Sequence, residues 1–117
     1  MRYALLGYGP PAGLDSLSPE ERKRWDDDDV KFNAMLNERD CVVFGVPLDH
    51  VNTATTVRVD DGAEATVTDG PFAETAEVLG GILVIDVEDF DEALDIAKQC
   101  PAARVGPLEV RPIPDRW

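Results

Sequence analysis

The sequence has few of the residues that build metal and redox sites. It contains two cysteines, Cys41 and Cys100, and one histidine, His50. A zinc site usually takes four nitrogen or sulfur ligands, so no metal site is expected. The cysteines are far apart in sequence and have no CxxC spacing, which favours two buried small side chains over a disulfide or redox pair.

Positive charge and long apolar runs are also scarce. The chain has 11 Lys and Arg against 24 Asp and Glu, a net charge of -13. This charge repels a nucleic-acid backbone and an anionic membrane surface. No apolar run approaches the roughly 20 residues needed to cross a bilayer, and the first run, residues 3–6, is too short for a signal peptide. We therefore predict a cytoplasmic protein with no nucleic-acid or membrane partner.

Motifs for serine hydrolysis and nucleotide binding are missing. Ser16 and Ser18 are the only serines, and neither lies in a GxSxG context. The pair Gly80-Gly81 has neither GxGxxG nor GxxxxGK around it, so it is expected to let the backbone turn into the following strand. No cofactor is predicted.

The length and the hydrophobic pattern predict one α+β domain over residues 1–117. Helices are expected at 19–38, after the capping sequence Ser18-Pro19-Glu20-Glu21, and at 89–100. Strands are expected at 2–8, 41–46, 55–60, 63–68, 81–87 and 108–113, with Asp61-Gly62 as a two-residue hairpin turn. Without the hairpin, the order is βαβ twice, which is the ferredoxin-like split βαβ arrangement with an inserted hairpin.

The first helix should place Trp25, Phe32 and Leu36 on the core. The acidic run 26–29 is interpreted as a solvated surface in preference to a cation site. Both helices would cover one face of the sheet, although residues 82–85 are too apolar for water on the other face. A second copy would cover that open face, so we predict a homodimer.

The stretch 68–81, TDGPFAETAEVLGG, gathers polar groups at an expected strand end. Asp69 is either a turn former or a general acid or base, since crowded carboxylates beside an aromatic ring suit proton transfer. Phe72 would bury its ring under the loop, and Thr75 would cap a short helical turn that places Glu74 and Glu77 on one face. His50, the only imidazole, is either a loop residue or an acid–base partner.

The segments around this stretch resemble the DGPF branch of the YCII-related proteins. The resemblance rests on Asp69-Gly-Pro-Phe-Ala-Glu-Thr75, on Thr53-Ala-Thr-Thr-Val-Arg58 before it and on Leu79-Gly-Gly81 after it. It implies a dimeric ferredoxin-like α+β barrel. It also implies a neighbourhood with extracytoplasmic-function sigma factors and, in related proteins, a His–Asp pair in a cleft and chloride removal from a chlorinated hydroxyquinol. The family motif has Lys where this chain has Ala76.

Two hypotheses follow. In the first, the chain is an enzyme that performs acid–base chemistry on a small molecule near the DGPF loop. Asp69, His50 and Glu74 would be catalytic in it, and Thr75, Phe72 and Arg58 would bind the substrate. In the second, the chain is a small-ligand sensor or an accessory protein that binds a sigma factor through its acidic surface.

Overall fold

The computed structural model describes residues 1–62 and 64–116, and it confirms the α+β fold. Four strands form one antiparallel sheet in the order β2-β5-β1-β6: β1 (Arg2–Gly9), β2 (Val42–Pro47), β5 (Val78–Asp86) and β6 (Leu108–Ile113). This order and direction are those of the split βαβ arrangement. Pro112 lies in the edge strand β6, where its missing N–H breaks no ladder on the outer side.

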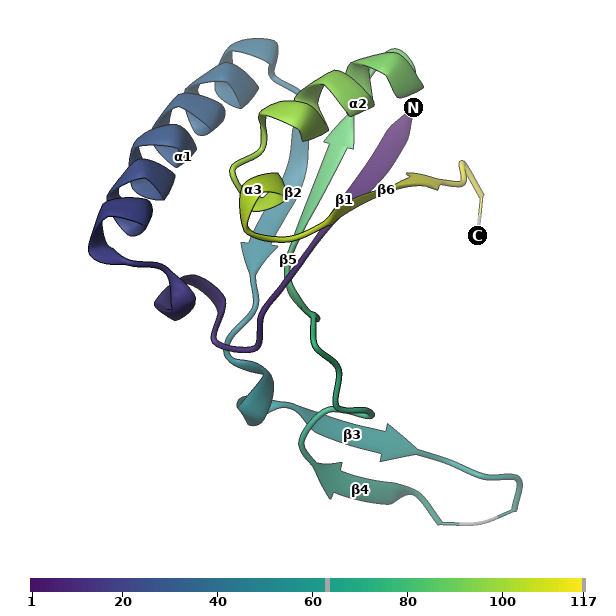
Figure 1. Cartoon of the computed structure of the whole chain (residues 1–117). Helices are drawn as coiled ribbons and strands as arrows, with labels where there is room; N and C mark the ends of the chain where they lie inside the picture. Colours follow the sequence, from purple (N-terminus) through teal and green to yellow (C-terminus); the bar gives the residue numbers. More distant parts are fainter. Residues whose placement is uncertain (63, 117) are drawn as a thin grey trace.

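Two helices, α1 (Pro19–Arg39) and α2 (Phe90–Gln99), lie on the same side of the sheet (Figure 1). The core between them and the sheet contains Leu5, Phe32, Leu36, Ile85 and Ile96, all buried. Leu5 and Ile85 are almost completely removed from water because β1 and β5 are the two central strands. This face therefore supplies most of the hydrophobic stabilisation of the fold.

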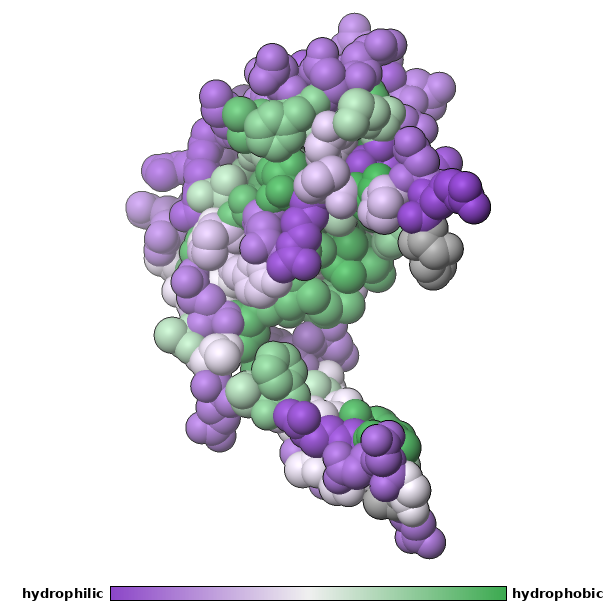
Figure 2. Space-filling view, turned by 90° about the vertical axis from the view of Figure 1, so that its right-hand side faces the viewer, coloured by the Kyte–Doolittle hydropathy of each residue, from purple (hydrophilic) through white to green (hydrophobic). Residues whose placement is uncertain are grey.

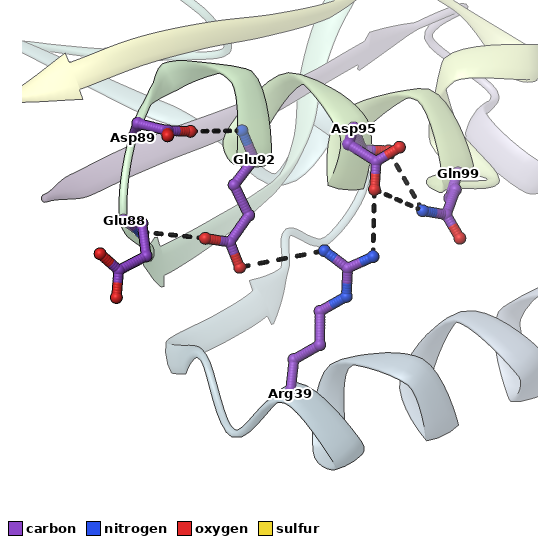
Figure 3. Close-up of polar contacts among 6 residues, drawn as sticks. All are labelled: Arg39, Glu88, Asp89, Glu92, Asp95 and Gln99. Carbon is purple, nitrogen blue, oxygen red and sulfur yellow. Dashed lines mark hydrogen bonds and ion pairs between the residues drawn. The ribbon is translucent and has the colours of Figure 1, made fainter.

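The ends of α1 are fixed by side chains. The Ser18 hydroxyl accepts from the Glu21 amide at 3.1 Å, and the Glu21 carboxylate accepts from the Ser18 amide at 3.0 Å, so the predicted capping box is present. At the other end, Arg39 lies 3.0 Å from the Asp95 carboxylate and 3.9 Å from that of Glu92, both on α2 (Figure 3). These contacts hold the end of α1 beside α2.

The inserted hairpin forms an arm, β3 (Thr55–Arg58) and β4 (Thr66–Asp69), that extends away from the main sheet (Figure 1). Its strands are shorter than predicted, and the predicted two-residue turn is wrong. Such a turn at Asp61-Gly62 would pair Arg58 with Ala65, whereas Arg58 pairs with Thr66. The start of the strand predicted over 63–68 falls on residue 63, which lies outside the described residues.

Strand β5 begins three residues before its predicted start at residue 81. Gly80 and Gly81 lie inside it instead of forming a turn before it. The cause is the length of β1, whose Gly9 pairs with Val78 beyond a register shift between Gly7 and Tyr8. The hydrophobic pattern of the sequence did not predict this extension, because the extra residues belong to the strand through backbone pairing with β1.

The other face of the sheet is open and apolar. The register places Ala4 opposite Val84 and Ile82 opposite Val46 on this face, and Phe44, half exposed, lies opposite Val84. Figure 2 shows hydrophobic surface gathered over the sheet above the arm. The chain exposes 8435 Å², whereas a compact monomer of 12.8 kDa is expected to expose about 6300 Å².

The described part of the chain also bears on membrane spans, metal sites and the cysteines. There, no helix is both long and apolar enough to cross a bilayer, and no three His, Cys, Asp or Glu side chains are grouped to hold a metal ion. Cys41 is buried, Cys100 is partly buried and both are free thiols. Burial raises the pKa of each thiol, and the prediction of a buried side chain is confirmed for Cys41, while Cys100 is only partly buried against the core.

Candidate functional site

The sheet order brings two loops together that are distant in sequence. Strands β1 and β2 are both antiparallel to β5, so they run in the same direction and end at the same edge of the sheet. With one strand between them, their ends are about 10 Å apart. The loop after β1 contains the 3-10 helix η1 (Gly13–Ser16), and the loop after β2 leads into the 3-10 helix η2 (Val51–Thr53).

These two loops bring His50 and Asp15 together. His50 Nε2 lies 3.3 Å from Asp15 Oδ2, and both side chains are at least half exposed. Local bonds fix the backbone on each side. The His50 amide donates to the Asp49 carboxylate at 2.7 Å, its carbonyl accepts from the Thr53 hydroxyl at 2.6 Å, and Gly13 has a φ of 58° where η1 begins. The chain therefore presents a His–Asp pair on two short, hydrogen-bonded turns.

The pair lines a cavity of about 740 Å³ between α1, the helix-covered face of the sheet and the loop after β1. This volume lies in the range of sites that take small organic molecules. Its wall is mostly apolar and includes Leu5, Phe32 and Leu36, together with Gly45 and Gly81 where the wall is backbone. The cavity can thus hold an apolar molecular body beside the imidazole.

Five titratable side chains line this cavity besides the partly buried thiol of Cys100: Tyr8, Asp15, Asp29, Asp49 and His50. Burial raises the pKa of Asp29, and the neighbouring carboxylate of Asp26 raises it further, whereas a hydrogen bond from Asn33 opposes the shift. The pKa of Cys100 is also raised, chiefly by burial and secondarily by the negative charge of Asp29. A carboxylate therefore lies in a partly desolvated part of the wall.

The acidic run of α1 does not act as one surface. Asp26 and Asp27 are exposed, Asp28 pairs with Arg104, and Asp29 lies on the cavity wall. The predicted solvated surface is correct for the first two residues only. Trp25, predicted in the core with Phe32 and Leu36, is half-buried at the cavity, and its indole Nε1 is enclosed without an acceptor among the described residues.

Of the six site residues predicted from sequence, only His50 lines the cavity. Asp69 and Arg58 lie on the arm, where Asp69 pairs with Thr55 in the backbone ladder. Glu74 is exposed in the connection between β4 and β5. Asp69 was the predicted partner of His50, but the carboxylate that the structure places at the imidazole is that of Asp15.

Two predictions about the loop after β4 are wrong. Phe72 does not bury its ring, since 76% of its surface is exposed. Thr75 caps no helical turn, because the described structure has none there, and its hydroxyl instead donates to the Glu77 carbonyl at 2.6 Å. Both errors come from treating the loop as self-contained, when it extends along the arm with little of the molecule to pack against.

Sequence reasoning missed Asp15, although a signal for it existed. The split βαβ order, once predicted, already requires the first two strands to run in the same direction and to end at one edge. The polar residues after each strand end, Asp15 and His50, are therefore candidates to meet. In the structure Asp69 pairs with Thr55 at the base of the arm and does not line the cavity.

Comparisons with known proteins agree with this architecture. The YCII-related domain matches residues 1–116. The chain belongs to the YCII-related family. An uncharacterised protein of Rhizobium meliloti (strain 1021) is 37% identical to this YCII-related chain over 120 residues, covering 97% of this chain and 92% of the relative.

A solved structure has the same fold. It is 5-chloro-2-hydroxyhydroquinone dehydrochlorinase from Burkholderia phenoliruptrix AC1100, in complex with 2,5-dihydroxybenzoquinone. The likeness has a TM-score of 0.52 at 15% identity and covers 97% of this YCII-related chain and 94% of the other. At this identity, the likeness shows the fold alone.

Proposed function

We propose that this YCII-related protein is an enzyme that moves a proton on a small molecule held in the cavity, with His50 as the acid–base group and Asp15 as its orienting partner. The observation that carries the proposal is the 3.3 Å contact between the imidazole and the carboxylate at the cavity wall. An imidazole changes charge near neutral pH, so it can both take and return a proton during turnover.

The contact brings Nε2, rather than Nδ1, beside the carboxylate of Asp15. In the proposed mechanism Nε2 carries a proton that faces Asp15, because an ionised carboxylate can only accept a hydrogen bond. In the neutral ring, Nδ1 then holds the free lone pair and can take a proton from a substrate O–H or C–H group. When it does, the resulting imidazolium lies 3.3 Å from the Asp15 carboxylate, and the proton can be returned to the product or to a leaving group.

The name of the structural neighbour suggests a reaction class. Removal of chloride from a hydroxylated ring requires a proton to leave a hydroxyl or a ring carbon as the carbon–chlorine bond breaks. A single positioned base suffices for this step, and it leaves chloride and a proton as products. We extend this class, elimination or proton transfer on a small hydroxylated molecule, to the cavity described above.

The test compares His50→Gln with the wild type on a panel of hydroxylated and chlorinated quinols, measuring chloride release and ring absorbance. Loss of a general base is expected to slow turnover by roughly a hundredfold or more, while the fold stays intact by circular dichroism. Asp15→Asn should reduce the rate less, since it removes orientation and leaves the base. Asp27→Asn, which is exposed and outside the cavity, serves as the charge-matched control.

Two results would contradict the assignment. One is a folded His50→Gln variant with wild-type turnover. The other is loss of turnover in Asp69→Asn but not in His50→Gln, which would place the chemistry on the arm as the sequence predicted. Absence of turnover with every member of the panel would refute the reaction class.

We also propose that the protein acts as a homodimer whose open sheet faces meet. The chain exposes about 2100 Å² more than a compact monomer of its mass, and each partner of a standard interface buries about 800 Å². Its radius of gyration is 16.4 Å against an expected value of about 13 Å. The extended arm accounts for the large radius of gyration, and a second copy that covers the apolar face would account for part of the excess exposed area.

The charges of this face favour a second copy over a basic protein partner. At its margins Arg2 lies 3.6 Å from Asp86, and Arg111 lies 2.8 Å from Glu109, so the acidic groups there are compensated within the chain. A basic sigma factor would instead be drawn to uncompensated acidic surface. No observation on the described residues favours that second prediction.

Light scattering tests the dimer. Phe44→Asp, on the half-exposed open face, should shift the protein toward monomer at micromolar concentration, because a carboxylate cannot be desolvated at an apolar interface. Val30→Asp on α1 is the control, since Val30 is equally apolar and 70% exposed but lies on a helix away from that face. A wild-type monomer at high micromolar concentration, or equal dissociation of both variants, would refute the proposed interface.

A further inference from the structure

The cavity contains charge of one sign only, apart from its histidine. Three carboxylates line it, those of Asp15, Asp29 and Asp49, whereas neither Lys nor Arg lines it among the described residues. Arg104, on α3 (Ala102–Val105) beside the cavity, is bound by Asp28. An anion that entered would face carboxylates across a mostly apolar wall, with no guanidinium or ammonium group to neutralise it.

Asp29 is less exposed than the His–Asp pair and lies on a different element. It is on α1, in the same wall as Phe32 and Leu36, while Asp15 and His50 lie on the loops at the ends of the strands. No ion pair reaches Asp29 within residues 1–62 and 64–116. Burial raises its pKa, although a hydrogen bond from Asn33 opposes the shift, so the ionised carboxylate lies in a partly dehydrated place. A ligand that donates a hydrogen bond, or that is positively charged, would relieve this cost.

We propose that Asp29 and the cation-free wall select the substrate by charge: the cavity takes neutral or cationic molecules that offer an O–H or N–H donor to Asp29, and it rejects anions. This inference rests on the proposed function, because it assigns a substrate class to the same cavity. The substrate's donor group binds the Asp29 carboxylate, its apolar body packs on the α1 side of the wall, and its reacting end lies toward His50. Asp29 is a specificity-determining residue here, and it transfers no proton in the reaction.

The experiment uses three one-ring probes of nearly equal size that differ in charge: tyramine, which is cationic, tyrosol, which is neutral, and p-hydroxyphenylacetate, which is anionic. Binding is measured by calorimetry on the full chain at low and high salt. Tyramine and tyrosol should bind at least about tenfold more tightly than p-hydroxyphenylacetate. The ratio between the dissociation constants of p-hydroxyphenylacetate and tyramine should decrease as the salt concentration rises. The Asp29→Asn variant should also show a smaller ratio between these two dissociation constants. The Asp27→Asn variant, which has the same change in net charge, should show the wild-type ratio.

Equal or tighter binding of p-hydroxyphenylacetate would overturn the proposal, as would binding of none of the three probes. The proposal would also be overturned if Asp27→Asn lowered the affinity ratio of the probes as much as Asp29→Asn does. The effect would then come from the total charge of the protein. This outcome is separate from that of the proposed function. If the probes bind in the proposed order of charge but His50→Gln has wild-type turnover, the proposed substrate class stands and the catalytic role of His50 is refuted.

Discussion

Replacement of Gly106 by alanine tests how tightly the segment after α3 packs on the end of β1. The backbone of Gly106 lies directly against this strand, next to the hydrogen bond from the Tyr8 amide to the Pro107 carbonyl at 3.0 Å. A methyl group at residue 106 would overlap the carbonyl oxygen of Tyr8 and come within 2.9 Å of Gly9 Cα. Because both obstacles are backbone atoms, no side chain can rotate away to make room.

The size of the effect follows from three contributions. Overpacking costs roughly 1–3 kcal/mol, and loss of the neighbouring hydrogen bond costs about 1 kcal/mol. Against this, alanine restricts the unfolded chain and returns roughly 0.4–1 kcal/mol. The free energy of unfolding should therefore fall by about 2–3 kcal/mol. For a chain of 117 residues, with an unfolding entropy of about 2.1 cal/mol/K per residue, the Tm should fall by about 8–12 °C.

Thermal and urea unfolding at one protein concentration measure this loss. Gly9→Ala is the matched control, because it lies on the adjoining strand end and its new methyl group would meet only Val105 Cγ1 at 3.8 Å, an ordinary contact. It should change the free energy of unfolding by less than about 1 kcal/mol. Equal stability of the two variants would refute the close approach of residue 106 to β1.

Three further predictions concern α1 and its ends. Ser18→Ala should lower the free energy of unfolding by about 1 kcal/mol, measured in urea, because it removes the capping hydroxyl. The pKa of Glu21 is lowered chiefly by the hydrogen bond from the Ser18 amide, so the stabilisation that Glu21 gives to the start of α1 should be lost as pH falls below 4.5. Asp40→Gly should raise the Tm by a few degrees, since Asp40 holds a φ of 50° that glycine adopts without strain, and no rise would contradict this reasoning. Asp29→Asn should stabilise the ligand-free protein at neutral pH. Because the pKa of Asp29 is raised in the folded state, the contribution of Asp29 to the free energy of unfolding is favourable below pH 3.8 and is lost as pH rises through the folded pKa. The free energies of unfolding of variant and wild type, measured in urea, should therefore converge in acid.

The candidate site was only partly accessible to sequence reasoning. His50 was found because it is the single imidazole, but its partner was sought at Asp69, in the stretch that resembles the family motif. The structure places Asp15 beside the ring, 35 positions earlier, through the parallel directions of β1 and β2. Asp29 was interpreted as part of a solvated run, because sequence shows the charge of α1 but not which residue faces a cavity.

The sequence by itself determined the two main helices, the six strands and their order. Capping at Ser18 and Asp89, the stop at Pro101 and the apolar runs act over a few residues, so a local pattern suffices to predict them. Only the tertiary structure decided the register shift in β1, the arm that keeps Asp69 from the cavity, and the meeting of Asp15 with His50. These depend on backbone pairing across the sheet, where the energy of a contact is set by residues distant in the chain and no local pattern records it.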